Sequence, residues 1–473
     1  MPPVGACRPR TLDSIKELST SFRDRSASPV RIAADLFGRI EGPGKRFNCF
    51  ITVLRDAALR QAEESERRFQ KGEPLGPLDG IPVAVKDLVY IAGVRCTAGS
   101  KILADNIAPY DSPVAARLKA AGAVIIGTTN MHEFAAGITG ENPHYGPVRN
   151  PWDTERISGG SSSGSAASVS AGLAACAIGT DTGGSVRTPA GLCGVIGLKP
   201  TYGRVSRLGV IPLATSFDTV GTLTSSSWDA AVLLGVLAGH GAEDLTTVAA
   251  EVPDYTEGLE APRGGYKVGV PRRYFHDSVD TEVEEVFSRF LDKLSQAGNT
   301  VCGVELEGVE KVSECWRTIR MAEATAFHIR WLDTAPEAYG EDVRASLEQG
   351  RKVSAVDYVN AQNLRPTLMQ SFAASMKDVD AVAVPSASIT APKIGEKLVD
   401  VNGKKVEARS ALMGMTLPFN VVGFPSVSVP AGLVHGLPVG VQLVAGPFEE
   451  AKLLRLAGSI EKLGPFPSPP STV

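Results

Sequence analysis

A stretch rich in glycine and serine, at residues 157–201, constrains the fold of this chain more than any other feature. Its sequence is ISGGSSSGSAASVSAGLAACAIGTDTGGSVRTPAGLCGVIGLKPT, and segments of ordinary composition flank it on both sides. Flexible linkers use the same small residues, but this stretch continues into apolar sequence with a TDTGGS turn inside it. We therefore predict that it is packed and that its backbone closely approaches another part of the protein or a ligand.

The composition indicates a soluble globular protein. The chain is 43% hydrophobic and 21% charged, with a formal net charge of -4, and its 473 residues allow one large domain or several smaller ones. No basic block suggests nucleic acid, and no apolar run is long enough to span a membrane. The seven cysteines include no CxxC pair, which favours reduced thiols in the cytoplasm over a disulfide framework or a zinc site. Residues 1–12 lack the apolar run of a signal peptide.

The chain alternates between helical and strand patterns. Apolar residues at three- and four-residue spacing predict helices over residues 11–23, 29–41 and 50–71. A short buried strand follows at residues 81–85, then a helix in SPVAARLKAAG and a second strand in AVIIGTTN. Such alternation is typical of α/β folds. The long loop after the second strand is a functional candidate, and within it we take three residues as candidate substrate contacts: Ala135, Ala136 and Gly137.

The segment TDTGGS has the composition of an oxyanion hole. Its consecutive glycines leave backbone N–H groups free to point together, and Ser185 would be the nucleophile beside them. The candidate donors are the N–H groups of Thr182, Gly183, Gly184 and Ser185. The preceding SGGSSSGSAA could cradle a phosphate at a helix start, but it lacks the patterns of a P-loop and of a dinucleotide fold.

A serine nucleophile needs a base, and the usual histidine is missing. None of the six histidines stands in a motif of a Ser-His-Asp triad, and there is no GxSxG elbow. A neutral lysine can replace the histidine, although lowering a lysine pKa from ~10.4 to 7 requires about 4 kcal/mol. Burial can supply this, and Lys86 directly follows the apolar run IPVAV. Taken alone, the same position is also compatible with a surface lysine that ends a strand.

Several long motifs together resemble the amidase signature family of serine hydrolases. They are GIPVAVKD, GTTNMHEF, YGPVRNPWD, SGGSSSGSAASV and GTDTGGSVRTPAGLCGVIGLKPTYGRVSR. The resemblance covers residues 75–223 and returns weakly near the C-terminus. It implies one α/β/α domain over residues 1–473, with a twisted mixed sheet covered by helices. Within it we expect N-terminal helices at 1–74, the signature core at 75–223 and a helical cover, contributing to substrate choice, at 281–377.

The resemblance also implies a catalytic unit in which two serines and a lysine act together. Matched motif by motif, these residues are Lys86, Ser161 and Ser185, with a cis peptide bond between Gly160 and Ser161. Lys86 would accept the proton of Ser161, Ser161 that of Ser185, and Ser185 would form an acyl-enzyme. No metal or organic cofactor is required.

The chain departs from the family pattern at two positions near these motifs. Ser163 stands where glycine is common, and His132 stands where an acidic residue is common. His132 either makes local hydrogen bonds or touches the substrate. Other polar residues in the motifs are expected to pack, cap or hold loops: Ser162, Ser163, Ser165, Thr180, Asp181 and Arg187.

The substrate is the least constrained part of the prediction. YGPVRNPWD and KPTYGRVSR resemble the A subunits of glutamine-dependent amidotransferases, but those have an acidic residue five positions before the PxN segment, where this chain has Met413. Met413, Met415 and Phe419 form either an apolar substrate pocket or part of the core. We expect a serine amidase that acts as a monomer or homodimer on small apolar or aryl amides, carbamates or esters. The alternatives are a glutaminase subunit that needs partner subunits, and a ligand-binding protein without catalysis.

Overall fold

Strands from both halves of the chain join in one mixed sheet of eleven strands, in the order β1-β3-β2-β6-β8-β7-β14-β15-β11-β9-β10. The computed structural model describes residues 12–260, 264–271, 273–276, 278–464, 466 and 468–470. The strands of this sheet are β1 (Phe50–Val53), β2 (Pro82–Lys86), β3 (Val124–Thr129), β6 (Cys176–Asp181), β7 (Ile196–Lys199), β8 (Thr219–Thr224), β9 (Lys267–Pro271), β10 (Thr300–Val304), β11 (Ala381–Pro385), β14 (Ser426–Val434) and β15 (Leu437–Val444). Two small hairpins pair β4 (Arg149–Asn150) with β5 (Asp153–Ile157), and β12 (Leu398–Val401) with β13 (Lys404–Glu407).

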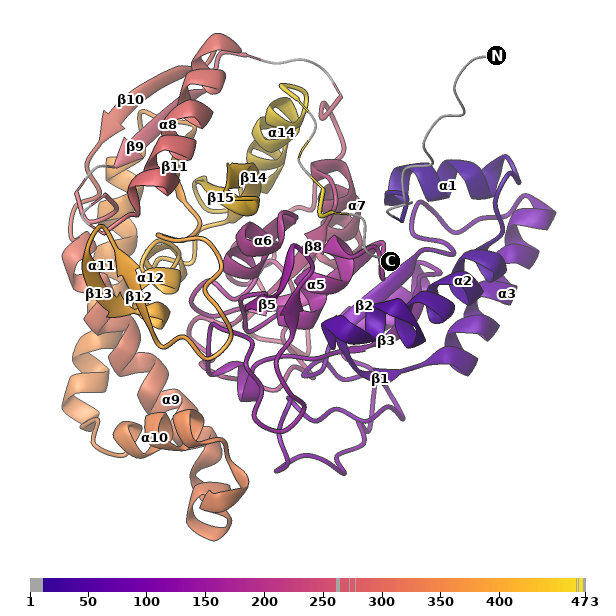
Figure 1. The fold of residues 1–473 in the computed structure, drawn as a ribbon, viewed down its shortest axis with the longest axis horizontal. Coiled ribbons are helices and arrows are strands. Elements are labelled where there is room, and N and C mark those ends of the chain that lie inside the picture. Colours follow the sequence, from indigo (N-terminus) through magenta and orange to yellow (C-terminus); the bar gives the residue numbers. More distant parts are fainter. Residues whose placement is uncertain are drawn as a thin grey trace.

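The helices lie on both faces of this sheet and at its ends (Figure 1). They are α1 (Ile15–Arg23), α2 (Pro29–Glu41), α3 (Arg55–Lys71), α4 (Pro113–Ala120), α5 (Ser163–Ser170), α6 (Arg187–Cys193), α7 (Ser227–Leu237), α8 (Thr281–Gln296), α9 (Val312–Thr334), α10 (Glu341–Gly350), α11 (Ala355–Ser375), α12 (Ala408–Met413), α13 (Leu417–Val421) and α14 (Glu450–Glu461). Short 3-10 turns occur at Pro43–Phe47, Glu133–Ala135, Val309–Lys311 and Pro336–Ala338.

Strand β2 illustrates how the sheet buries both faces. Val83 and Val85 belong to the hydrophobic cluster that includes residues of α1, α4, α7 and α14, whereas Ala84 faces the cluster of α2, α3, α5 and α6. Strands β3, β2 and β6 run parallel to one another, and β8, β7, β14, β15 and β11 continue the sheet with antiparallel pairs. A strand buried on both faces carries a continuous apolar run. The expected α/β/α domain with a mixed sheet is therefore confirmed.

The glycine- and serine-rich stretch is packed, as predicted. Every residue from 157 to 170 is buried. A Cβ added to Gly164 on α5 would lie 2.2 Å from the carbonyl oxygen of Cys49 and 2.7 Å from that of Asn130. The small side chains of α5 thus let the helix backbone approach the loops beside the sheet closely.

One expectation about the elements is wrong. Residues 50–71 are not one helix, because Phe50–Val53 form the edge strand β1, antiparallel to β3. Its aromatic and β-branched residues favour a strand, and α3 begins only at Arg55. The segment 281–377 is mainly helical, with α8, α9, α10 and α11, and Thr300–Val304 between α8 and α9 form β10 beside β9. The start of the helix predicted over 11–23, and Cys7, lie outside the described residues.

Two groups of helices lie on opposite sides of the molecule. In Figure 1, α1, α2 and α3 lie near β1 on one side, while α9, α10 and α11 lie on the other side and extend away from the sheet. Helix α9 contacts the centre of the molecule near its start. Its Trp316 donates a hydrogen bond to the carbonyl oxygen of Thr182, at 2.8 Å. A segment far along the sequence thereby reaches the TDTGGS loop.

Candidate active site

Lys86 is a fully buried lysine at the end of β2, with 0% of its side chain exposed. Its Nζ lies 2.8 Å from Ser161 Oγ, 3.0 Å from Ser162 Oγ and 2.8 Å from Thr180 Oγ1. Burial lowers the pKa of Lys86 to about 7, although the charges of Asp181 and Asp218 oppose this change. A substantial fraction of the amine is therefore neutral near pH 7 and can accept a proton.

The hydrogen bonds of the hydroxyl groups around Lys86 show which of these groups can donate to its amine. The Ser162 hydroxyl donates to the carbonyl oxygen of Thr180, at 3.1 Å, so it can only accept from Nζ. A neutral amine has two N–H donors and one lone pair. The hydroxyl that points its hydrogen at this lone pair is therefore that of Ser161 or Thr180. Ser162 and Thr180, which the sequence predicts to be packing and capping groups, also contact the lysine.

Ser161 and Ser185 are brought to the same place by two loops that bond to each other. The Ser162 N–H donates to the carbonyl oxygen of Ser185, at 3.2 Å, and the His132 N–H donates to that of Ser161, at 3.3 Å. The peptide bond between Gly160 and Ser161 is cis, as the resemblance implies. The structure thus brings the Lys86 amine into contact with Ser161 and the backbone of Ser185 into contact with that of Ser162.

The TDTGGS loop offers fewer free N–H groups than the sequence suggests. The Gly184 N–H donates to Asp181 Oδ1, at 2.8 Å, and cannot also bind an oxyanion. Its inclusion in the predicted oxyanion hole is therefore wrong. The N–H groups of Gly183 and Ser185 have no acceptor among the described residues, so these two, together with Thr182, remain the candidate donors.

Gly184 has a steric role instead. Its φ is +120°, in the region that favours glycine, and an added Cβ would lie 2.0 Å from Thr416 Oγ1. The Thr416 hydroxyl also donates to the carbonyl oxygen of Gly183, at 2.9 Å. Thr416 thus holds the loop at Gly183 and leaves no space for a side chain at Gly184.

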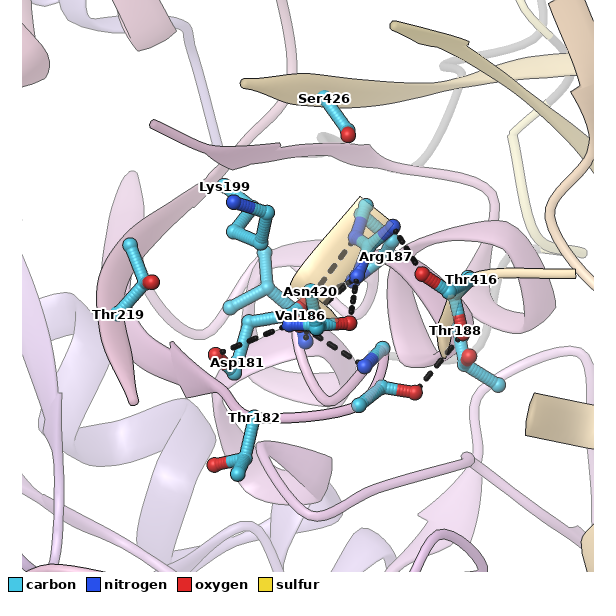
Figure 2. A network of polar contacts seen from close by, with 12 residues as sticks. Asp181, Thr182, Val186, Arg187, Thr188, Lys199, Thr219, Thr416, Asn420 and Ser426 are labelled. Carbon is cyan, nitrogen blue, oxygen red and sulfur yellow. Dashed lines mark hydrogen bonds and ion pairs between the residues drawn. The ribbon is translucent and has the colours of Figure 1, made fainter. Parts of the chain in front are cut away.

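A buried ion pair between Asp181 and Arg187 holds this loop (Figure 2). Asp181 accepts from the N–H groups of Gly184 and Val186 and from Arg187 Nη2, at 2.9 Å. Arg187 also donates to the carbonyl oxygen of Thr416, at 2.9 Å. Burial alone would raise the pKa of Asp181, but the Arg187 guanidinium holds it well below its usual range. The prediction that Asp181 and Arg187 hold the loop is confirmed.

A second buried lysine, which the sequence analysis missed, lies near this network. Lys199 ends β7, donates to the carbonyl oxygen of Pro200, at 3.0 Å, and has 0% of its side chain exposed. Burial and the nearby Arg187 lower its pKa to about 7. Its context, IGLKP, repeats the pattern of an apolar strand ending in lysine, and that signal could have identified it.

A narrow pocket in front of Ser185 contains most of the predicted substrate contacts. Ala135, Ala136, Gly137 and Met413 line it together with Thr182, Gly183 and Ser185. The pocket continues into an outer groove of about 910 Å³, which Met415 also lines. Phe419 lines neither space. It stacks on Phe275, with the ring centroids 5.8 Å apart, so its assignment as a substrate contact is wrong.

Three residues missed by the sequence analysis lie where the narrow pocket meets the outer groove. Trp316 and Arg320 come from α9, and Arg409 comes from α12; all three line both spaces. Nothing in the sequence distinguishes them, because arginine and tryptophan on amphipathic helices are common on protein surfaces.

His132 makes the local contacts that one of its two interpretations requires. Its Nε2 lies 2.9 Å from Asp342 Oδ2. A Cβ added to Gly137 would lie 2.1 Å from the same nitrogen, so the imidazole packs against the wall of the narrow pocket. His132 itself does not line that pocket.

The matches to known proteins agree with this geometry. A family model described as Amidase matches residues 31–454. The chain belongs to the amidase family. It is therefore a hydrolase of carbon–nitrogen bonds.

Two solved structures are similar over nearly their whole length. One, described as a vestigial protein complex that reveals the origins of an s-triazine catabolic enzyme, has a TM-score of 0.92 and 33% identity, with 96% of this chain and 100% of that chain covered. The other is an amidase, with a TM-score of 0.87 and 34% identity over 95% and 99% of the two chains.

Other relatives are components of a larger enzyme, glutamyl-tRNA(Gln) amidotransferase. The A subunit of this enzyme from Carboxydothermus hydrogenoformans is 37% identical, and that from Geobacter metallireducens is 38% identical; each match covers 95% of this chain and 96% of the relative. These matches overturn the expectation that the protein is a monomer or homodimer which acts alone on a small amide or carbamate. They also overturn the expectation that no nucleic acid takes part in its reaction. That expectation relied on the apolar Met413, whereas the neighbouring pocket wall carries charge.

Two negative findings concern the described part of the chain. None of its helices is both long and apolar enough to cross a membrane. It also contains no group of three or more His, Cys, Asp or Glu side chains that could hold a metal ion.

Proposed function

We propose that this chain hydrolyses the side-chain amide of glutamine through an acyl-enzyme on Ser185, as the ammonia-releasing subunit of an amidotransferase. The observation that carries the proposal is the 2.8 Å contact between the buried Lys86 amine and Ser161 Oγ, beside the Ser185 loop. The near-complete coverage of two amidotransferase A subunits supports the placement in a complex.

The reaction follows from the proton positions. Neutral Lys86 accepts the proton of Ser161, and Ser161 accepts that of Ser185 while Ser185 Oγ attacks the amide carbonyl carbon. The N–H groups of Gly183 and Ser185 stabilise the oxyanion, and losing one such donor typically lowers the rate by ~10²–10³. As the C–N bond breaks, Ser161 returns a proton to the nitrogen, which leaves as ammonia. Water then attacks the acyl-enzyme ester, releasing glutamate and restoring the Ser185 hydroxyl.

A role in a complex requires an acceptor for the ammonia. The name of the relatives supplies one, glutamyl-tRNA(Gln), and describes their chain as one subunit of the enzyme. This chain would accordingly release ammonia for use on another subunit. The tRNA would be a partner of the assembled enzyme.

The test is release of ammonia and glutamate from glutamine, by the full chain alone and by the chain co-expressed with the other subunits of such an amidotransferase. We expect Ser185→Ala to abolish the release in both preparations. Ser168→Ala is the matched control, because Ser168 on α5 donates only to the carbonyl oxygen of Ser165, at 3.0 Å. If glutamine stays intact with the chain and with the complex, the proposal is wrong.

A further inference from the structure

The narrow pocket in front of Ser185 has a strongly positive wall. Among the described residues that line it, Arg320 and Arg409 are the charged ones. Neither guanidinium has an ion pair with a carboxylate in the described part of the chain. The acidic residues nearby, including Asp342 and Glu407, line the outer groove and not the narrow pocket.

Arg320 is the more unusual of the two. Only 4% of it is exposed, and its Nε is buried without a hydrogen-bond partner. Its other contacts are Ser346 Oγ, to which Nη2 donates, and the ring of Trp316, with 5.4 Å between the guanidinium carbon and the ring centroid. A buried charge is normally paired. Burial and the neighbouring Arg409 lower the pKa of Arg320 to about 9, so the site destabilises the positive charge that it holds.

We infer that Arg320 and Arg409 bind a carboxylate of the substrate, so that the enzyme selects amides whose acyl group ends in a negative charge. A carboxylate would supply the missing partner of Arg320 Nε and would separate the two positive charges. Guanidinium groups suit this task because they bind carboxylates through paired hydrogen bonds. Since both arginines line the same narrow pocket as Ser185, the substrates expected are short monoamides of dicarboxylic acids.

The inference rests on the proposed amide hydrolysis at Ser185, and it names the substrate class. Glutamine belongs to this class through its α-carboxylate. Its ammonium would need a separate acidic group, because Met413 occupies the position that is acidic in the amidotransferase pattern. Asp342 in the outer groove is such a group: burial alone would raise its pKa, but its hydrogen bond with His132 holds the pKa at about 2.

The experiment measures equilibrium binding by calorimetry, with the full chain carrying Ser185→Ala. Two pairs of ligands differ only by a carboxylate in place of a methyl group: succinamate against butanamide, and glutaramate against pentanamide. Charge-assisted hydrogen bonds contribute about 1.5–3 kcal/mol, so the carboxylated member of at least one pair should bind about tenfold or more tightly. Arg320→Gln and Arg409→Gln should each remove most of this preference, because each should weaken binding of the carboxylated member more than binding of the neutral amide.

Two further variants separate recognition from folding. Arg320→Lys keeps a positive charge and should retain part of the preference. Arg344→Gln removes an exposed arginine on α10 that lines neither space, and it should bind all four ligands as the Ser185→Ala parent does. Equal affinities within both pairs, absence of binding, or a loss in Arg409→Gln that affects both members equally would overturn the inference.

This readout does not depend on turnover. A chain that prefers the carboxylated amides but releases no ammonia would refute the proposed function alone. Conversely, a chain that hydrolyses amides through Ser185 but binds neutral and carboxylated amides equally would refute only the carboxylate inference.

Discussion

At the scale of the residue, Lys86 determines how the activity responds to pH. Burial lowers its pKa to about 7, against the opposing charges of Asp181 and Asp218. Below this pH the amine is protonated and cannot accept the Ser161 proton. We therefore expect kcat/KM for glutamine to rise with pH through about 7 and then to level off. A pH–rate profile of ammonia release measures this directly.

The matched variant for this prediction is Lys86→Met, which keeps the length of the side chain and removes the base. Its activity should fall by ~10²–10⁴, the usual contribution of a general base. The remaining rate should lose the rise near pH 7. An unchanged rise in this variant would show that another group is the base.

At the scale of the element, the ion pair between Asp181 and Arg187 joins four parts of the fold. Asp181 ends β6 and Arg187 begins α6, while the Arg187 guanidinium also donates to Asn420 Oδ1 on α13, at 2.6 Å, and to Gln442 Oε1 on β15, at 2.8 Å. Removing one partner of a buried pair leaves an uncompensated charge, which typically costs about 3–5 kcal/mol. We expect Arg187→Met to lower the free energy of unfolding by this amount, as measured by denaturant titration.

A double variant provides the control for this prediction. With Asp181→Asn added to Arg187→Met, the buried negative charge is gone, so part of the lost stability should return. If the double variant were less stable than Arg187→Met by the full effect of Asp181→Asn alone, the two side chains would not be coupled.

Other elements show how much of the fold and of the site the sequence could predict. β2 and β3 were identified because a strand buried on both faces has a continuous apolar run, and Lys86 was found because it ends such a run. The strand at Phe50–Val53 was missed, since four residues ahead of a helix carry too short a pattern to separate the two. Trp316, Arg320 and Arg409 could not be assigned to the site, because only the tertiary packing of α9 and α12 brings them to Ser185.

Gly184 shows a limit of sequence-based prediction at the level of single N–H groups. The sequence predicted a converging set of N–H groups from the glycines, but whether each N–H is free depends on where Asp181 points, and only the folded loop determines this.

At the scale of the whole molecule, two buried lysines should make stability depend on pH. The pKa of Lys199 is lowered to about 7, mainly by burial, whereas an unfolded lysine has a pKa of ~10.4. Between these values the unfolded chain binds one more proton than the folded chain at this site, so its contribution to the free energy of unfolding increases with pH. The slope for one such site is at most about 1.4 kcal/mol per pH unit.

Because other buried groups titrate as well, the measurement compares variants at several pH values. Lys199→Met should be stabilised relative to the unmodified chain near pH 7, and this advantage should shrink as the pH rises toward ~10.4, the pKa of the unfolded lysine, above which the lysine is neutral in both states. Lys377→Met, which removes an exposed lysine, should show no such trend. Since Lys199 lines neither the narrow pocket nor the outer groove, the change in stability should leave the pH profile set by Lys86 in place. A shift of that profile in Lys199→Met would instead mean that the two lysines interact through the Asp181 network.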